Sequence, residues 1–462
     1  MHAQLARPAV AAQLDDARVR AAPAPDERAR LRERRARREP GNPEDERAAH
    51  DRIVARAKPE RVWIGLELTG EGASVDALAG AIAARADDPA PIVESPDEQT
   101  RVVTLHPGAE PLELSAEGAG VRLRASTGAA GPGYHRHVLA LAEALDVAWA
   151  PGGDSTGWRE ARDPEALEEV FLDWLGATAA QILELAADGA SGFALAMPAG
   201  VAYEHDEVVA TQLGPRSFAW LEATRDDARA GVDVFPWWSA PRDAAYYRGL
   251  ALVELWRTIR WRPPITDEER AAMERVATWV EKAHGLDPAL SLPWAEQSEL
   301  LTLLDEASLR ATRAHLKAQS LGPARAGYRR RAVHVELTGG WSLTIGGELP
   351  ERWEARGTGG AWDEGRSVFF TSFSARGDGP PPTSEQTLGG MPPLDGDELF
   401  ELERGTLRGL AALAELEEDG APLYRLEAHA AQGPRAAVGT RAFRRPDDRE
   451  WALATWGSLR RR

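Results

Sequence analysis

Hydrophobic positions divide the chain into one segment without a periodic apolar pattern and three segments that have one. Residues 1–58 are rich in Ala, Arg, Pro and acidic side chains, and their few apolar residues repeat at neither helical nor strand spacing. A helix of such residues would be charged on every side and could bury nothing. We therefore expect a solvated, partly disordered arm. A docking peptide, or a site cut by an arginine-directed protease, is the alternative for its arginine-rich part, residues 28–38.

Residues 59–150 carry short apolar runs separated by turn residues, which is typical of a small α/β domain. Residues 62–68 predict a largely buried strand, and a short helical pattern follows from Ser74. A second helix is expected after Pro132-Gly133. Further strands are expected at residues 101–105, 112–114, 121–123 and 147–150.

Residues 151–325 show helical periodicity and are rich in tryptophan, which predicts a mainly helical domain. Asp163 as N-cap and Pro164 at the first helical position begin one long amphipathic helix. Thr266 and Glu269 have the spacing of a capping box, which predicts the start of another. We expect these helices to share a tryptophan-rich core.

Residues 329–462 change to an alternating pattern of apolar and polar residues, which indicates strands. The expected order is β-β-β-α-β-β-α, which is typical of an α+β domain. The helices are expected near residues 403–415 and from Asp447 onward. The strands are expected at residues 333–337, 341–345, 366–374, 424–430 and 436–443. The whole chain is thus predicted to be a multidomain α+β protein.

Several aromatic landmarks of this C-terminal part follow a known order. They are a strand after Trp341, a glycine-rich stretch that holds Trp353 and Trp362, a Val-Phe-Phe-Thr-Ser strand at 368–372, and a closing Glu-Trp-Ala-Leu helix at 450–453. In this order the C-terminal 125 or so residues resemble the Mog1/PsbP-like α+β family. Members of that family are mostly adaptor or assembly modules, so the resemblance implies binding rather than catalysis. It assigns no functional residue.

Composition narrows the chemistry that the chain can support. The sequence contains no cysteine, which excludes disulfides, zinc–thiolate sites, iron–sulfur clusters and a cysteine nucleophile. Lys and Arg number 55 against 73 Asp and Glu, giving a net charge of −18. Because so acidic a chain repels polyphosphate, we expect no nucleic-acid partner. A protein or peptide, in particular a basic one, fits this charge better.

The cellular setting follows from weaker signals. The chain has neither an apolar run of 18 residues nor a signal-peptide pattern, so we expect no membrane span and a cytoplasmic location. Nearly all of its basic residues are arginine, which is typical of a GC-rich coding sequence and hence of a bacterium. Gly-rich nucleotide loops are absent, and no cofactor is expected.

One segment matches a nucleophile motif. Residues 153–157 read Gly-Asp-Ser-Thr-Gly, and Ser155 would be the nucleophile if they formed the strained strand-to-helix turn of an α/β-hydrolase. His205 or His284 is a candidate base for it, and no position favours one of them. We expect no helix before Asp163, however, so the turn would lack its support. The alternative is a polar turn in which Asp154 and Ser155 bond their own backbone.

Histidines offer a candidate metal site. His135 and His137 would share one face of a strand, and His205 stands in a Glu-His-Asp-Glu run. The residues around His135 favour a helix instead, which would separate the two imidazoles. The alternative interpretation is therefore ordinary capping plus a solvated acidic loop.

Tryptophan and arginine together are the strongest candidate for a binding surface. Both residue types anchor protein partners and stack on ligands. Core packing with arginines at its edge is the alternative. The candidate binding residues are Trp237, Trp238, Tyr246, Tyr247, Trp256, Trp261, Arg257 and Arg260.

These observations favour a non-catalytic binding or adaptor protein that engages a protein or peptide. A regulator, or an immunity-type protein that neutralises a basic partner, would be one form of it. The alternative function is a hydrolase that uses Ser155 or a histidine and carboxylate metal centre. Such an enzyme would need Ser155 or His205 within hydrogen-bond reach of a second catalytic group.

Overall fold

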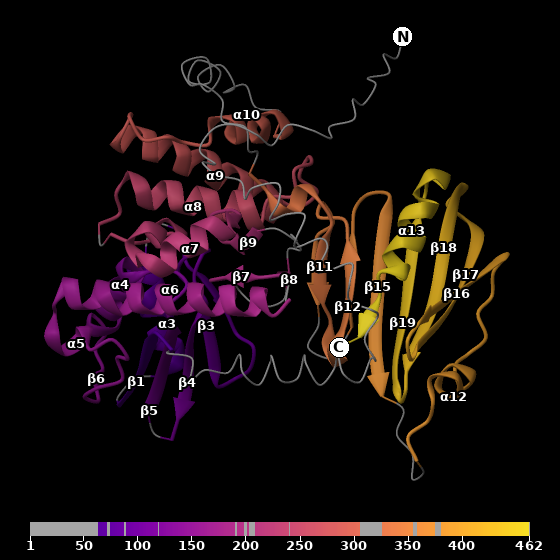
Figure 1. The fold of residues 1–462 in the computed structure, drawn as a ribbon, viewed down its shortest axis with the longest axis horizontal. Coiled ribbons are helices and arrows are strands. Elements are labelled where there is room, and N and C mark those ends of the chain that lie inside the picture. Colours follow the sequence, from indigo (N-terminus) through magenta and orange to yellow (C-terminus); the bar gives the residue numbers. More distant parts are fainter. Residues whose placement is uncertain are drawn as a thin grey trace.

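The computed structural model describes residues 63–461 with ten internal gaps. The predicted N-terminal arm, residues 1–58, lies outside the described residues. The described part confirms a multidomain α+β fold built from helices and several sheets (Figure 1). The gaps are residues 72–73, 87–88, 119, 190–191, 198–200, 203–207, 240, 305–325, 354–357 and 375–379.

The first unit is a six-stranded antiparallel sheet of order β2-β3-β4-β5-β1-β6. The strands expected from the sequence are present. The unit also contains the helices α3 (Val75–Arg85) and α4 (Pro132–Glu143). The strands are β1 (Gly65–Glu71), β2 (Ile92–Glu94), β3 (Thr100–Thr104), β4 (Leu112–Glu117), β5 (Gly120–Ser126) and β6 (Ala148–Trp149).

The middle of the chain is helical, as predicted. Figure 1 shows its helices stacked above the first sheet, from α6 up to α10. Three short strands, β7 (Ala194–Leu195), β9 (Val208–Thr211) and β10 (Arg216–Ser217), form a small sheet beside them. The helices are α5 (Trp158–Ala161), α6 (Pro164–Ala187), α7 (Phe218–Asp226), α8 (Ala244–Arg257), α9 (Asp267–Leu286) and α10 (Trp294–Leu303).

Local sequence explains where these helices begin. The Asp163 side chain accepts hydrogen bonds from the backbone of Glu165 and Ala166, which confirms it as the N-cap of α6. The Thr266 hydroxyl accepts from the backbone of Glu269 at the start of α9. The Glu269 carboxylate reaches back to the backbone N–H of Ile265 rather than to that of Thr266. The predicted box is thus displaced by one residue.

One continuous hydrophobic core joins the first sheet to the helices. It extends from Ile64 on the edge of β1 to Ala326, across the predicted domain boundary at residue 150. The boundary itself stays a prediction. Helix α6 is also, within the described ranges, long and apolar enough to cross a membrane. One such helix is weak evidence of a membrane span; 28% of its apolar 18-residue window is buried in the molecule, and Phe171 and Leu175 of α6 lie in this core.

The C-terminal part contains a seven-stranded sheet and three strands of a four-stranded sheet, whose fourth strand, β8, comes from the middle of the chain. Their orders are β13-β14-β15-β19-β18-β17-β16 and β20-β12-β11-β8. Helices α12 (Ser384–Gly389) and α13 (Arg449–Gly457) accompany them. The strands are β8 (Val201–Ala202), β11 (Val333–Glu336), β12 (Trp341–Ile345), β13 (Glu351–Trp353), β14 (Thr358–Trp362), β15 (Arg366–Ser374), β16 (Glu398–Arg404), β17 (Leu407–Glu418), β18 (Ala421–Gln432), β19 (Arg435–Phe443) and β20 (Arg460–Arg461).

The prediction of a helix at residues 403–415 was wrong. These residues belong to the hairpin β16–β17, which turns at Gly405, a glycine with a φ of 56°. The segment is rich in Leu, Ala and Glu, which favour helices, but helix propensity is a weak preference that tertiary pairing overrides. Strand β17 pairs along its whole length with β18, and that pairing decides its conformation.

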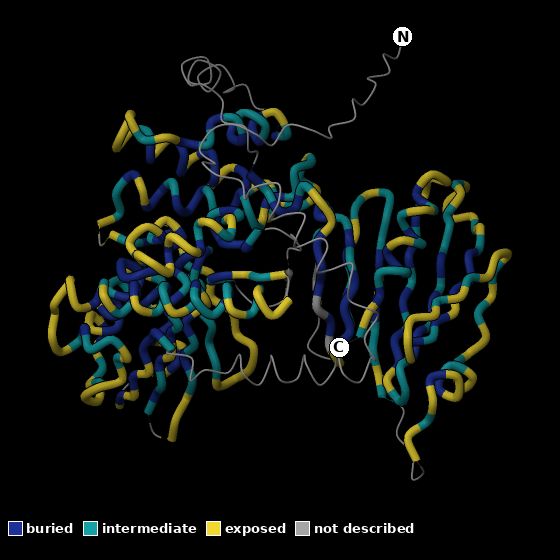
Figure 2. The backbone as a smooth tube through the Cα atoms, viewed as in Figure 1, coloured by how far each residue is buried: buried dark blue, intermediate teal, exposed yellow. Residues whose placement is uncertain are grey.

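The seven-stranded sheet has two different faces. We call the inner face the side that bears Phe370 and Ala437, which pack into a core with the four-stranded sheet. Helix α13 covers the rest of the inner face through Ala452 and Trp456. We call the outer face the opposite side, which bears Phe369. Figure 2 shows buried residues concentrated between the sheets and exposed residues along the outermost strands.

Candidate functional site

The Gly-Asp-Ser-Thr-Gly segment is a loop fastened to the edge of β1. The Ser155 hydroxyl accepts a hydrogen bond of 2.9 Å from the backbone N–H of Gly65, and the Ser155 backbone N–H donates to the Gly65 carbonyl at 3.1 Å. Within the described part of the chain, no imidazole contacts Ser155. The expectation of no helix before Asp163 was wrong, because α5 begins at Trp158. The loop nevertheless uses the serine hydroxyl as a structural acceptor.

Asp154 turns inward from the same loop and meets His135 of α4. The Asp154 carboxylate accepts from the backbone N–H groups of Thr156 at 2.8 Å and Arg159 at 2.7 Å, as the polar-turn interpretation expected. Its Oδ1 lies 3.1 Å from His135 Nε2, and both side chains are fully buried. Burial alone would raise the pKa of Asp154, but hydrogen bonds from His135 and Thr156 outweigh it and hold the pKa well below its usual value.

The second nitrogen of His135 is also occupied. Nδ1 lies 2.8 Å from the hydroxyl of Thr127, whose side chain is buried as well. With both ring nitrogens in use, His135 has no lone pair available for a metal or for Ser155. Its environment therefore supports a structural role, in which it ties α4 to the Asp154 loop.

The three candidate metal ligands do not come together. His137 lies on α4, where its ring stacks 4.9 Å from that of Trp237 and its Nε2 is 3.4 Å from the Arg242 guanidinium. His205 lies outside the described residues. No group of three or more His, Asp or Glu side chains suited to a metal occurs in the described ranges.

The aromatic and arginine residues singled out in the sequence lie in or at the edge of the core. Trp237, Tyr246 and Tyr247 are buried, and the other five are half-buried. Trp256 stacks on Tyr328 with ring centres 4.9 Å apart. None of the eight is exposed. Their part in binding stays a prediction, but an exposed surface must be sought elsewhere. The half-buried five are Trp238, Trp256, Arg257, Arg260 and Trp261.

Sequence reasoning missed a buried histidine among these rings. His106 lies within 6.0 Å of Tyr134, Trp237 and Tyr246, measured between ring centres. Its Nδ1 accepts from the backbone N–H of Gly108 at 2.9 Å, so the proton resides on Nε2. Burial, followed by the positive charge of Arg257, lowers the pKa of His106 to about 3. This imidazole is therefore neutral at physiological pH.

The polar atoms of that cluster are enclosed by packed rings. Nε2 of His106, Oη of Tyr134 and Nε1 of Trp237 are buried without hydrogen-bond partners among the described residues. The ring centres of His106, Tyr134, Trp237 and Tyr246 lie 4.5–6.0 Å from their neighbours. We interpret the cluster as the polar centre of the core. A lone His between a strand and a Pro-Gly turn gave no signal of this in the sequence.

Five of the nine large apolar side chains that are exposed among the described residues lie on the outer face of the seven-stranded sheet. Because side chains alternate along a strand, Phe369 and Phe373 of β15 project outward, whereas Val368 and Phe370 are buried inward. Trp362 of β14 shares this face beside β15, whereas Leu399 and Leu410 lie on β16 and β17, beyond the outward-facing Arg425, Glu427 and His429 of β18. The exposed fractions are 38% for Trp362, 47% for Phe369, 47% for Phe373, 74% for Leu399 and 44% for Leu410.

An acidic edge strand borders this apolar surface. Glu401 and Glu403 of β16 are exposed on this face, and Glu401 lies directly opposite Leu410 of the neighbouring strand. Glu398 points to the inner side, where it pairs with Arg449 of α13. The sequence was interpreted as a helix here, so the exposed face of this strand was not predicted. The alternation of Glu and Leu along β16 was the signal that could have revealed it.

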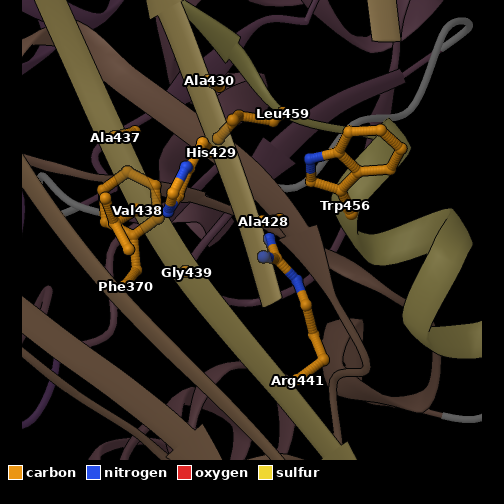
Figure 3. Close-up of a pocket in the computed structure, with 10 residues that line it drawn as sticks. All are labelled: Phe370, Ala428, His429, Ala430, Ala437, Val438, Gly439, Arg441, Trp456 and Leu459. Atoms are coloured by element: carbon orange, nitrogen blue, oxygen red, sulfur yellow. The ribbon is translucent and has the colours of Figure 1, made fainter. Parts of the chain in front are cut away.

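A small hollow lies on the inner face, between strands β18 and β19 and helix α13. Figure 3 shows the Arg441 side chain running along the strands toward Ala428, with Trp456 on one side and Phe370 and His429 on the other. Arg441 is only 1% exposed, and burial lowers its pKa to about 10, so it stays charged at neutral pH. Arginine inside a sheet domain was not predicted from the sequence.

Comparisons with known proteins add little to this picture. No family model and no curated protein matches the chain. Among solved structures, a crystal structure of a protein from Bacteroides thetaiotaomicron VPI-5482 is similar at 13% sequence identity and a TM-score of 0.22. The match covers 27% of this chain and 45% of that one. A likeness this low carries no argument, and the resemblance to the Mog1/PsbP-like family stays a prediction.

Proposed function

We propose that this chain is a non-catalytic binding protein of the bacterial cytoplasm that holds a basic protein on the outer face of its seven-stranded sheet. The observation that carries the proposal is the exposure of three aromatic side chains on β14 and β15 of that face, Trp362, Phe369 and Phe373. Exposed apolar patches mark protein interfaces, and aromatic residues contribute most to their affinity. Phe369 and Phe373, each 47% exposed, are the expected anchors.

Charge favours a basic partner over a neutral one. The net charge of the chain is −18, and the strand that borders the apolar surface carries Glu401 and Glu403 on that face. Acidic side chains around an apolar centre steer a basic protein toward it and add specificity. The same charges keep two copies of this chain apart, which makes a second copy the weaker candidate.

The alternative of a hydrolase receives no support from the candidate nucleophile. The Ser155 hydroxyl accepts from the Gly65 backbone, and the nearest loop carboxylate, Asp154, is committed to His135. The described residues therefore bring no base to Ser155. A binding role needs none of this chemistry.

The proposal can be tested by capture with matched variants. The intact chain, immobilised, is expected to retain a basic protein from an extract of its own bacterium, and Phe369→Ser/Phe373→Ser is expected to lose that protein. Leu286→Ser is the matched control, because Leu286 is 56% exposed at the end of α9, away from the sheet. The proposal is wrong if the double variant, with an unchanged melting temperature, retains as much of the same protein as the control.

A further inference from the structure

A positive charge is buried on the inner face without an acidic side chain beside it. Arg441 of β19 is 1% exposed, and its neighbours across the sheet are Val368 and Leu426. None of the residues that line the hollow with it is acidic, and His429, paired with Val438, projects to the outer face. Burying an unpaired charge costs several kcal/mol of folding free energy. A bound anion beside Arg441 would therefore stabilise the folded protein.

The unpaired atoms lie on one edge of the guanidinium. Nε and Nη2 of Arg441 are buried and have no acceptor among the described residues. The same edge of Arg445 holds the carboxylate of Asp448, with Nε–Oδ2 at 3.0 Å and Nη2–Oδ1 at 3.3 Å. Two parallel N–H donors of this kind match the two oxygens of a carboxylate or oxyanion. Arg441 is one of the residues that line the hollow.

Two neighbouring residues complete the arrangement. Nε1 of Trp456, from α13, lines the same hollow and is likewise buried without an acceptor. Gly439 leaves room for the guanidinium, because a Cβ at this position would lie 2.7 Å from Nη1 of Arg441. The hollow thus presents N–H donors from two elements and no side-chain carboxylate.

We propose that Arg441 and Trp456 form a binding site for a small carboxylate or oxyanion between β19 and α13. The anion's two oxygens accept from Nε and Nη2 of Arg441, and the Trp456 indole N–H donates to one of them. No position in the hollow admits a water-sized sphere, so binding requires the side chains that line it to move apart, and this restricts the ligand to the smallest anions.

The test uses the intact chain with sodium acetate, formate, phosphate or sulfate, each compared with sodium chloride at equal ionic strength. A ligand that binds the native state raises the melting temperature, here by at least about 2 °C at saturating anion. We expect this rise, and a change in tryptophan fluorescence, with one of these anions. Acetate and formate test for a carboxylate ligand, and phosphate and sulfate test for an inorganic oxyanion.

Variants assign the effect to the site. Arg441→Met is expected to abolish the anion-dependent rise, and Trp456→Phe to abolish the fluorescence change and weaken the rise. Arg435→Met on the same strand is the control, because Arg435 is exposed, and it is expected to respond as wild type does. The proposal fails if no anion raises the wild-type melting temperature. It also fails if Arg441→Met shows the same anion-dependent rise in melting temperature as wild type. If Arg441→Met does not fold, the proposal fails when Trp456→Phe matches wild type in both melting temperature and fluorescence.

Discussion

Nε2 of His135 lies 3.1 Å from Oδ1 of Asp154, and neither side chain is reached by solvent. This contact joins helix α4 of the first unit to the loop that leads into the helical unit. It accounts for two features of the sequence that could have been catalytic. The histidine pattern and the Gly-x-Ser-x-Gly motif meet here, and both serve to hold the loop against the sheet.

Asp154→Ala should therefore destabilise the protein. The change leaves His135 and the backbone N–H groups of Thr156 and Arg159 without their acceptor in a buried place. We expect a loss of about 3 kcal/mol or more in the free energy of unfolding, measured by urea denaturation. Asp146→Ala, at an exposed position nearby, should stay within about 0.5 kcal/mol of wild type. Equal effects of the two changes would contradict this account.

The first glycine of the motif is predicted to matter more than the last. Gly153 has a φ of +79°, and a Cβ on it would lie 2.2 Å from the carbonyl oxygen of Glu67. Gly157 has a φ of +72° but open space around it. Gly157→Ala should cost only the roughly 1–2 kcal/mol of a left-handed conformation, whereas Gly153→Ala should cost clearly more. Thermal denaturation of both variants checks this order, and a reversed order would refute a structural role for the motif.

His106 should give the protein a pH-dependent stability. Its pKa is about 3 in the folded protein, against 6.5 for an ordinary histidine. Between these values the unfolded chain binds a proton that the folded one does not. The stabilisation is therefore complete above pH 6.5 and is lost, by about 1.4 kcal/mol per pH unit, as the pH falls toward 3.

The matched variant for this test is His106→Asn, which keeps an acceptor for the Gly108 backbone and removes the titration. The free energy of unfolding of wild type and variant is measured from pH 7.5 down to about 4.5. We expect the slope of the variant to be smaller by about the amount given by one histidine. Parallel curves would show that His106 is accessible to protons in the folded state.

Burial predicts opposite outcomes for two tryptophans. Trp237 is 2% exposed and packs on His137 and Tyr246, whereas Trp362 is 38% exposed on the outer face of the sheet. Trp237→Ala should lower the free energy of unfolding by about 3–5 kcal/mol, and Trp362→Ala by about 1 kcal/mol or less. Chemical denaturation of the two variants tests this. A mild effect of Trp237→Ala would contradict a core role for its cluster and favour a binding surface instead.

Local sequence signals predicted much of the fold. The starts of α6 and α9 were predicted from Asp163 with Pro164 and from Thr266 with Glu269. Capping depends on neighbouring residues alone, so the sequence is enough to find it. Alternation along residues 366–374 likewise announced β15. The hairpin β16–β17 escaped prediction because its Leu, Ala and Glu residues favour a helix, and only pairing with distant β18 makes them a strand.

The candidate sites were harder to predict, because exposure is a property of the assembled chain. Trp237 and Phe369 are equally suited to an interface by residue type, yet one is buried and the other is exposed. His106 and Arg441 acquired their environments from strands and helices far away in the sequence. Neither position carries a motif that residue spacing could have revealed.

The most direct test of the central proposal is site-specific photo-crosslinking in the bacterium that makes the protein. Phe369 on the outer face, or Leu286 at the control position, is replaced by the photoreactive p-benzoylphenylalanine in the intact chain. We expect position 369 to form a light-dependent crosslink to a second, basic polypeptide that position 286 does not form. No crosslink from position 369, or the same crosslinks from both positions, would contradict a binding role for this face.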